Sequence, residues 1–270
     1  MRSESSHPWR LLPPIKAPGA VQMAVDQWLL AQHCQDRQPN CLRFYTWSPA
    51  AISLGYHQRR WPNEWHQMVA GDQPLDLVRR PTGGRAVLHQ GDLTYSVITS
   101  AFQGRRIEVY QAICQFLIDG WATLGIPLTY GHQQRGYEKT DNCFSSPTAA
   151  DLVMTDGYKL IGSAQVKREG RRTSEKARSP LSANHTVLQH GSMRLHPDVA
   201  LHQKIFAEPL VIPNFPERLQ SLSANALNQT VIDALTVAAN HCFSTTWIVQ
   251  PLSEDELHQA IACFGNQPLV

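Results

Sequence analysis

The sequence predicts an α+β fold in which helices pack on a mixed β-sheet, and three observations support this prediction. Apolar residues recur at helical spacing in several segments, most clearly over residues 107–124. Short runs alternate between apolar and polar residues as strands do, for example residues 93–98. Helices and strands are also mixed along the chain instead of forming separate blocks, which favours helices layered on one sheet.

The first part of the chain is expected to begin with an amphipathic helix and then to form most of the sheet. Val21, Ala24 and Trp28 share one face of a helix over residues 19–32. Strands are expected over residues 42–47, 51–55, 75–80 and 88–99, and a short helix over residues 61–68. The helix over 107–124 carries one apolar stripe of Tyr110, Ile113, Leu117, Trp121 and Leu124, and it ends at Gly125.

The remainder is expected to be less regular. A hairpin over residues 151–165 turns at Asp156-Gly157, a favourable pair for a tight turn. Beyond residue 195 no element is predicted until a helix over 224–239, a strand over 246–251, and a last helix that Ser253 and Glu256 begin with a capping box. We expect one domain over residues 1–270, with a core over about 9–220 and a small helical annex over 221–270.

The composition is that of an ordinary globular protein with an ample core. The 270 residues are 42% hydrophobic and carry a net charge of +2. The near-neutral charge argues against nucleic acid as the main partner. No apolar run approaches the roughly 20 residues that a membrane span needs, and residues 1–6 lack the apolar core of a signal peptide. We therefore expect a cytoplasmic protein that does not bind membranes.

Six cysteines are scattered along the chain, at positions 34, 41, 114, 143, 242 and 263. None of them forms a Cys-x-x-Cys pair, so neither a metal site nor a dense disulfide framework is predicted. Cys143 differs because it lies in the turn-rich stretch 140–147, just before the hairpin at 151–165. From the residue alone, a buried structural thiol is the simpler interpretation.

A turn with two adjacent glycines stands at the centre of the sequence. It reads Arg79-Arg80-Pro81-Thr82-Gly83-Gly84-Arg85-Ala86-Val87-Leu88-His89. The proline stiffens the entry to the turn, and the glycines permit positive φ and close backbone approach. The three arginines could converge on an anionic or carbonyl-bearing ligand. Taken alone, the stretch is explained as well by an ordinary corner between two strands.

Two later stretches complete a pattern. The hairpin continues through Gly157-Tyr158-Lys159-Leu160-Ile161-Gly162-Ser163-Ala164-Gln165, and Leu188-Gln189-His190-Gly191-Ser192 follows. The three stretches, in this order, resemble the biotin/lipoate protein ligase and octanoyltransferase superfamily from about residue 9 to residue 195. The resemblance implies a class II biotin/lipoate ligase-like catalytic domain and a monomer.

The resemblance also implies which residues form the site. Lys159 falls on the lysine of the family pattern Gly-x-Lys-x-x-Gly-Ser-Ala-Gln, which touches the acyl carbonyl; from the residue alone it would be a solvated strand lysine. Cys143 lies in a Cys-Phe-x-x-Pro setting similar to that of the cysteine nucleophile in the cysteine-dependent octanoyltransferases. The residues expected to bind the acyl group or substrate are Arg79, Arg80, Thr82, Gly83, Gly84, Arg85, Ala86, His89, Gly162, Ser163, Ala164 and Gln165. His190 is expected to have a pocket or structural role.

The function that this resemblance implies is acyl transfer. An octanoyl group would pass from octanoyl-acyl carrier protein to Cys143 as a thioester. It would then pass to a lysine of a lipoyl-type domain, in the glycine cleavage H protein or in a 2-oxoacid dehydrogenase acyltransferase subunit. Transfer from thioester to amide runs downhill, so no cofactor is expected.

Two alternatives stay open. The first is an ATP-dependent lipoate–protein ligase that acts through lipoyl-AMP, in which ATP and Mg would be required and the arginines would meet the phosphates. The second is a non-catalytic acyl- or cofactor-binding homologue. Arg79 and Arg80 could hold a phosphate-bearing donor arm or a carboxylate at a strand end, and the sequence does not choose between these roles.

Residues 166–187 form a basic segment. Its charged residues are Lys167, Arg168, Glu169, Arg171, Arg172, Glu175, Lys176 and Arg178. Related sequences cross this interval with a short turn, so it is interpreted as an insertion. It is expected either to be a solvated loop or to steer acidic protein partners toward the site.

Overall fold

The computed structural model describes residues 8–131, 143, 151–169, 185–266 and 269. In chain order, its elements are β1 (Trp9–Ala17), α1 (Gly19–Cys34), β2 (Cys41–Trp47), β3 (Ala51–Leu54), the 3-10 helix η1 (Asn63–Gln67), β4 (Val69–Ala70), β5 (Gln73–Pro74), β6 (Asp76–Arg79), β7 (Val87–His89), β8 (Asp92–Thr99), α2 (Arg106–Thr123), β9 (Leu128–Tyr130), β10 (Leu152–Met154), β11 (Lys159–Glu169), β12 (His185–Arg194), α3 (Val199–Phe206), α4 (Glu217–Gln220), α5 (Ala224–Phe243), β13 (Trp247–Val249) and α6 (Glu254–Phe264). Eight strands form the main sheet in the order β13-β1-β2-β8-β12-β11-β10-β9. A smaller sheet has the order β6-β3-β7, and β4 pairs with β5.

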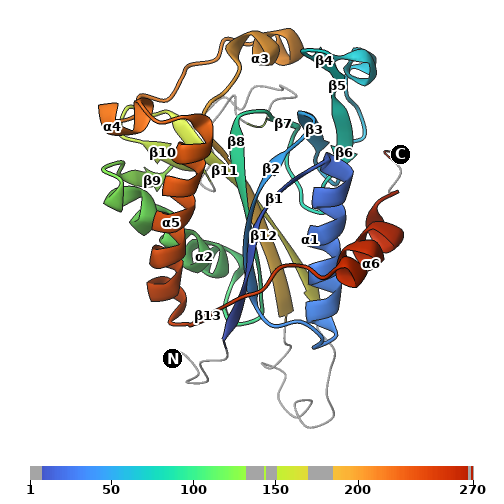
Figure 1. Ribbon diagram of the computed structural model, residues 1–270, viewed down its shortest axis with the longest axis vertical. Coiled ribbons are helices and arrows are strands. Elements are labelled where there is room, and N and C mark those ends of the chain that lie inside the picture. Colours follow the sequence, from blue (N-terminus) through green and yellow to red (C-terminus); the bar gives the residue numbers. More distant parts are fainter. Residues whose placement is uncertain (1–7, 132–142, 144–150, 170–184, 267–268, 270) are drawn as a thin grey trace.

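Helices cover both faces of the main sheet (Figure 1). α1 and α6 pack together on one face, and α2 and α5 pack together on the other. The larger core lies on the α2–α5 side, where Phe116, Trp121 and Leu235 are fully buried. β1 pairs in parallel with β2 and β13, whereas β8, β12 and β11 run antiparallel to their neighbours. The predicted α+β fold with a mixed sheet is therefore confirmed.

Most of the predicted elements are present. The helices expected at 19–32, 107–124 and 224–239 are α1, α2 and α5, and the short helix expected at 61–68 is η1. The hairpin turning at Asp156-Gly157 joins β10 to β11. Within the described ranges, no helix combines the length and the apolar character that crossing a bilayer requires.

The chain passes from the small sheet to the main sheet at Gly91. β7 pairs with β3 in the small sheet, whereas β8 pairs with β2 and β12 in the main sheet. The expectation of one strand over 88–99 is therefore wrong. Gly91 has a φ of 66°, and a Cβ at this position would lie 1.8 Å from the carbonyl oxygen of His196. This switch brings the β6–β7 turn against β12, where Thr82 Oγ1 lies 2.6 Å from His190 Nε2.

Residues 221–270, which we expected to form a small annex, contribute to the main layers. β13 pairs with β1 at the sheet edge, α5 packs on α2, and α6 packs on α1. Arg10 of β1 forms an ion pair of 2.7 Å with Glu256 of α6. The predicted capping box of Ser253 and Glu256 begins α6. These contacts join β13 and α6 to β1.

Several elements were not predicted, and the reasons are local. β1 contains Pro13 and Pro14, which weaken a strand signal, and its register with β2 shifts between Leu12 and Ile15 to accommodate them. β9 has only three residues. Asp198 caps the N-terminus of α3, where its carboxylate accepts a hydrogen bond from the backbone N–H three residues later, but this helix spans only eight residues. Such short elements give too little periodicity to detect.

The basic segment 166–187 is strand at both ends, contrary to the expectation of a loop. Val166 pairs with Leu188, and Glu169 pairs with His185, so β11 and β12 continue as the arms of a hairpin. Lys167 and Arg168 are exposed on one arm. The other basic residues fall within 170–184, outside the described residues.

Gly120 allows α2 and α5 to approach closely, because a Cβ there would lie 2.6 Å from Leu235 Cδ2. Alanine is favoured over glycine in a helix by about 1 kcal/mol. We nevertheless expect Gly120→Ala to lower the free energy of unfolding by about 1–3 kcal/mol, because the helices must move apart. Urea denaturation measures this change. The double variant Gly120→Ala/Leu235→Ala should lose less than the sum of the two single losses; strictly additive losses would contradict a direct contact.

Candidate active site

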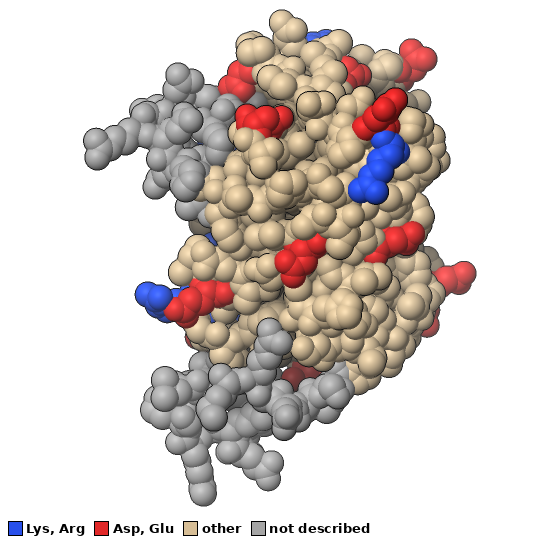
Figure 2. Space-filling view, turned by 90° about the vertical axis from the view of Figure 1, so that its left-hand side faces the viewer, with Lys and Arg blue, Asp and Glu red and all other residues tan. Residues whose placement is uncertain are grey.

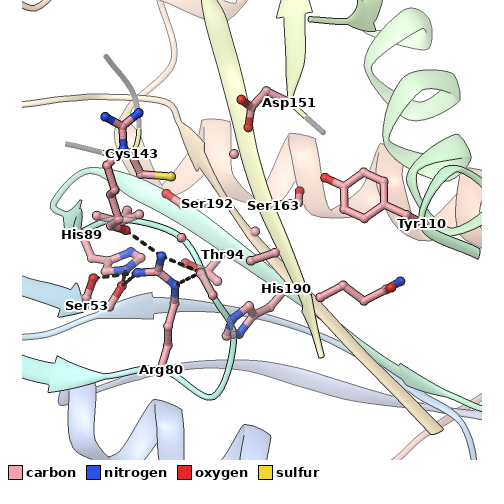
Figure 3. Close-up of a pocket in the computed structure, with 18 of the residues that line it drawn as sticks. Ser53, Arg80, His89, Thr94, Tyr110, Cys143, Asp151, Ser163, His190 and Ser192 are labelled. Atoms are coloured by element: carbon pink, nitrogen blue, oxygen red, sulfur yellow. Dashed lines mark hydrogen bonds between the residues drawn. The ribbon is translucent and has the colours of Figure 1, made fainter. Parts of the chain in front are cut away.

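A cavity of about 460 Å³ lies among the two sheets and α2 (Figure 3). It is lined by Met23, Tyr45, Trp47, Ser53, Arg80, Gly83, Gly84, Arg85, Val87, His89, Thr94, Arg106, Ile107, Tyr110, Cys143, Asp151, Lys159, Gly162, Ser163, Ala164, Gln165, His190, Gly191 and Ser192. Strands β8, β11 and β12 and the β6–β7 turn thus contribute to one enclosure. A cavity of this size is in the usual range for sites that bind small molecules.

Most of the predicted site residues meet at this cavity, although they come from distant parts of the chain. Those that line it are Arg80, Gly83, Gly84, Arg85, His89, Cys143, Lys159, Gly162, Ser163, Ala164 and Gln165. Arg79, Thr82 and Ala86 do not line it. The residues around Cys143, at 140–142 and 144–147, lie outside the described residues, so the predicted turn-rich setting cannot be compared there.

Two glycines, Gly84 and Gly55, are required where the β6–β7 turn meets the end of β3. Gly84 has a φ of 97°, in the region that favours glycine. A Cβ on Gly55, just after β3, would lie 1.8 Å from the carbonyl oxygen of Gly84. Tyr56 N–H also donates to the carbonyl of Thr82 over 2.8 Å. The turn is therefore packed backbone to backbone against the end of β3.

Arg80 holds this turn from inside. Its Nε and Nη2 donate to the carbonyl of Gly83 over 3.2 and 2.9 Å, and Nη2 also donates to the carbonyl of Arg85 over 2.6 Å. Its Nη1 donates to the carbonyl and the hydroxyl of Ser53 over 2.7 and 3.1 Å. All five N–H donors of the guanidinium are thus satisfied by oxygen atoms of the protein. The side chain is 6% exposed.

Arg79, which was predicted to bind substrate, instead holds the loop that follows β3. Its Nη1 donates to the carbonyls of Gly55 and Gln58, each over 2.7 Å, and its Nη2 donates to the carbonyl of Leu269 over 2.5 Å. Its guanidinium carbon lies 5.5 Å from the centre of the Trp61 ring. The two predicted roles of Arg79 and Arg80, in holding a phosphate or a carboxylate, find no support in these contacts.

Lys159 and Cys143 meet at one end of the cavity. Lys159 Nζ donates to the backbone carbonyl of Cys143 over 2.6 Å and forms an ion pair of 2.9 Å with Asp151. Cys143 N–H donates to the carbonyl of Ala86 over 2.9 Å. Figure 3 shows the Cys143 sulfur directed into the cavity. Cys143 is thereby attached both to the glycine turn and to β11, which joins two of the predicted motifs.

Asp151 was not predicted as a site residue. It lies one residue before β10 and is 3% exposed, and its partner Lys159 is 4% exposed. A buried lysine requires a counter-charge. That requirement was the available signal, because Asp151 begins the same predicted hairpin that carries Lys159.

A buried ionic network lies beneath the cavity floor. Asp26 of α1 forms an ion pair of 3.1 Å with Arg43 of β2. Its other carboxylate oxygen accepts from the Tyr45 hydroxyl over 2.9 Å and lies 2.9 Å from His190 Nδ1. Burial opposes ionisation of Asp26, but Arg43 and His190 hold its pKa below the ordinary value. His190 is bound in turn to Thr82, so the network fixes the glycine turn to β12.

A second network surrounds His89. Its Nδ1 lies 2.8 Å from Asp92 Oδ2, which also accepts from the Ser192 hydroxyl over 2.6 Å. The ring stacks on Trp47 with centroids 3.8 Å apart. Burial lowers the pKa of His89, which favours the neutral imidazole. The predicted pocket role of His89 therefore rests on a fixed, uncharged ring.

The arrangement suits chemistry at a carbonyl group. The cavity offers apolar and aromatic surface for a chain, a thiol at one end, and a lysine beside that thiol. A cysteine of this kind can act as a nucleophile, and a fixed ammonium can stabilise an oxyanion. Among the residues that the structure describes, no three His, Cys, Asp or Glu side chains gather closely enough to hold a metal ion.

Comparison with known proteins agrees with this geometry. Residues 18–237 match the model of the lipoyl protein ligase A/B catalytic domain. The octanoyltransferase LipM of Symbiobacterium thermophilum is 34% identical over 243 residues, which cover 84% of this chain and 78% of that protein. The octanoyltransferase LipM of Geobacillus kaustophilus is 33% identical over 243 residues, which cover 85% and 81%.

A solved structure shares the fold at lower identity. The crystal structure of lipoate-protein ligase A bound with ATP superposes with a TM-score of 0.68 at 19% identity, over 97% of this chain and 96% of that one. The class II biotin/lipoate ligase-like architecture predicted from the motifs is therefore confirmed.

Asp26→Asn should lower the free energy of unfolding by about 3–5 kcal/mol at neutral pH, because Arg43 is left buried without an anion. The folded-state pKa of Asp26 is lowered, so its contribution is present above the unfolded value of about 3.9 and is lost as pH falls through the folded value. Urea denaturation at pH 7 and at pH 3 should show that the difference in free energy of unfolding between Asp26→Asn and wild type is smaller at pH 3. Asp233→Asn, on the exposed side of α5, is the matched control. An equal deficit at both pH values would contradict this account.

Proposed function

Because the chain belongs to the lipoyl protein ligase A/B catalytic domain family, we propose that it is an octanoyltransferase of lipoate biosynthesis with Cys143 as its nucleophile. The observation that carries the proposal is the position of Cys143, whose thiol enters the cavity while its backbone is bound by Lys159. The relatives named octanoyltransferase LipM support the same activity. The donor is proposed to be octanoyl-acyl carrier protein.

The reaction proceeds in two transfers. In the first, the Cys143 thiolate attacks the carbonyl carbon of the donor thioester, and the donor thiolate leaves as the new thioester forms. In the second, the amine of an acceptor lysine attacks that thioester, the Cys143 thiolate leaves, and the amine releases a proton to solvent as the amide forms. Lys159 is proposed to stabilise the negative charge on the carbonyl oxygen in both steps.

The acceptor is proposed to be a lipoyl-type domain. The glycine cleavage H protein and the acyltransferase subunits of 2-oxoacid dehydrogenases carry such domains. No cofactor is proposed, because a thioester already has the free energy needed to form an amide. The protein is proposed to act in the cytoplasm as a monomer.

The ligase alternative makes a different demand on the arginines. An acyl-adenylate mechanism requires cations that meet the phosphates of ATP. Arg79 and Arg80, the two arginines first considered for that role, bind backbone carbonyls instead. This observation favours the transferase over the ligase.

Intact-mass analysis after mixing the protein with octanoyl-acyl carrier protein, without ATP, tests the proposal. We expect a gain of one octanoyl group that hydroxylamine removes and that Cys143→Ala abolishes. Cys263→Ala is the matched control, because Cys263 is exposed on α6. Acceptor modification that requires free acid and ATP, with no adduct on Cys143, would identify a ligase instead.

Lys159→Ala should slow the transfer by about 100- to 1,000-fold, the usual effect of removing one oxyanion donor. The loss should fall mainly on kcat, because the interaction strengthens as the carbonyl oxygen becomes negative. Steady-state assays over a range of octanoyl-acyl carrier protein concentrations separate kcat from KM. A rise in KM with unchanged kcat would assign Lys159 to binding alone.

A further inference from the structure

Arg80 is a buried cation without a carboxylate partner. Two other buried cations near the cavity have one: Arg43 pairs with Asp26, and Lys159 pairs with Asp151. Among the described residues, no carboxylate forms an ion pair with Arg80, and its hydrogen bonds all end on neutral oxygen atoms. A buried charge of this kind lowers the free energy of any anion placed beside it.

The Arg80 guanidinium and the Cys143 sulfur both lie against Gly84. Arg80 Nη2 and Cys143 Sγ lie 2.7 and 3.8 Å from the point that a Cβ on Gly84 would occupy. The two groups therefore share the space that the missing side chain of Gly84 leaves open. Burial lowers the pKa of the Arg80 guanidinium, and the charge of Cys143 opposes that shift. A thiolate at Cys143 would therefore be attracted to the Arg80 guanidinium.

A chain of hydrogen bonds fixes the Arg80 guanidinium on its other side. Asp92 can only accept, so His89 Nδ1 donates to it over 2.8 Å. The neutral ring then accepts on Nε2 from the Ser53 hydroxyl, 2.8 Å away, and Ser53 Oγ in turn accepts from Arg80 Nη1 over 3.1 Å. The carboxylate and the neutral ring thus set the direction of each hydrogen bond. The chain runs from Asp92 to Arg80 through two side chains that touch neither Cys143 nor Lys159 in any hydrogen bond of the described residues.

The other charged groups that face Cys143 leave this role to Arg80. The ammonium of Lys159 is compensated by Asp151. Arg194, at the end of β12, also interacts with the charge of Cys143, but its guanidinium carbon lies 5.4 Å from the centre of the Tyr158 ring and Tyr158 is its larger electrostatic partner. Arg85 lies on the same turn and is partly exposed to solvent, which screens its charge.

We propose that Ser53 and His89 are positioning residues that hold the Arg80 guanidinium where it stabilises the thiolate of Cys143. The inference rests on the proposed use of Cys143 as the nucleophile. Lys159 acts on the carbonyl oxygen, and Arg80 acts on the sulfur, so the two cations have separate tasks. Removing the Ser53 hydroxyl takes away one hydrogen-bond partner of Arg80 Nη1 and the partner of His89 Nε2 at the same time.

The rate of alkylation of Cys143 by iodoacetamide, followed from pH 5 to pH 10 by peptide mass spectrometry, tests the proposal. The midpoint of this profile reports the pKa of the thiol. We expect Ser53→Ala and His89→Gln each to raise the midpoint by about 0.5–1 pH unit, and Ser53→Thr, which keeps the hydroxyl, to restore it. The exposed thiol of Cys263, measured in the same digest, should titrate identically in all variants.

Ser96→Ala is the matched control. Ser96 is a fully buried serine of β8 whose hydroxyl has no hydrogen-bond partner among the described residues. It should leave the Cys143 midpoint unchanged. Arg80→Gln should shift the midpoint further than Ser53→Ala; if that variant does not fold, Ser53→Ala and His89→Gln together decide.

Unchanged midpoints in both Ser53→Ala and His89→Gln would overturn the inference, as would an equal shift in Ser96→Ala. The proposed function fails separately. If no octanoyl adduct forms on Cys143 although Ser53→Ala moves the midpoint, the protein is not a cysteine-dependent transferase. The proposed positioning of Arg80 by Ser53 and His89 is then still supported. If the adduct forms and the midpoint does not move, only the positioning role is lost.

Discussion

The site depends on one buried guanidinium, that of Arg80, which donates hydrogen bonds to the backbone carbonyls of the β6–β7 turn. The carbonyls of Ser53, Gly83 and Arg85 point toward the same small volume, where buried acceptors without donors would be costly. Arg80 supplies donors to all three. The turn so formed presents the carbonyl of Ala86 to Cys143, and β11 presents Lys159 to the same residue. Contacts from both sheets thus fix the position of the Cys143 thiol.

The cavity combines apolar walls with a polar floor, and the floor is compatible with an apolar ligand because its charges are already bound. Asp26 is bound by groups from β2 and β12, and Asp92 by groups from β7 and β12. A polar group whose hydrogen bonds are complete has little to gain from water. An acyl chain can therefore lie over these residues without leaving buried polar atoms unpaired. Reactivity is confined to the end where Cys143 and Lys159 meet.

The sequence predicted the fold class, the main helices and most of the cavity lining, because these depend on local periodicity and on motifs within short stretches. It did not predict the pairings that hold the site. Asp26 and His190 are 164 positions apart, and no local pattern connects them. Arg79 ends β6 and Arg80 follows it in the same motif, yet only Arg80 lines the cavity, whereas Arg79 binds the loop after β3. Asp151 was missed because its role exists only once Lys159 is buried.

The order of strands in the main sheet has a consequence for synthesis on the ribosome. β1 lies between β2 and β13, and β13 is the last strand in sequence order among the described residues. Until residues 247–249 have left the ribosome, one edge of β1 keeps unpaired backbone groups. Arg10 on that strand also cannot form its ion pair until Glu256 has been synthesised. A nascent chain can therefore assemble the walls of its cavity early, while the free edge of β1 stays open to wrong pairing until β13 has been synthesised.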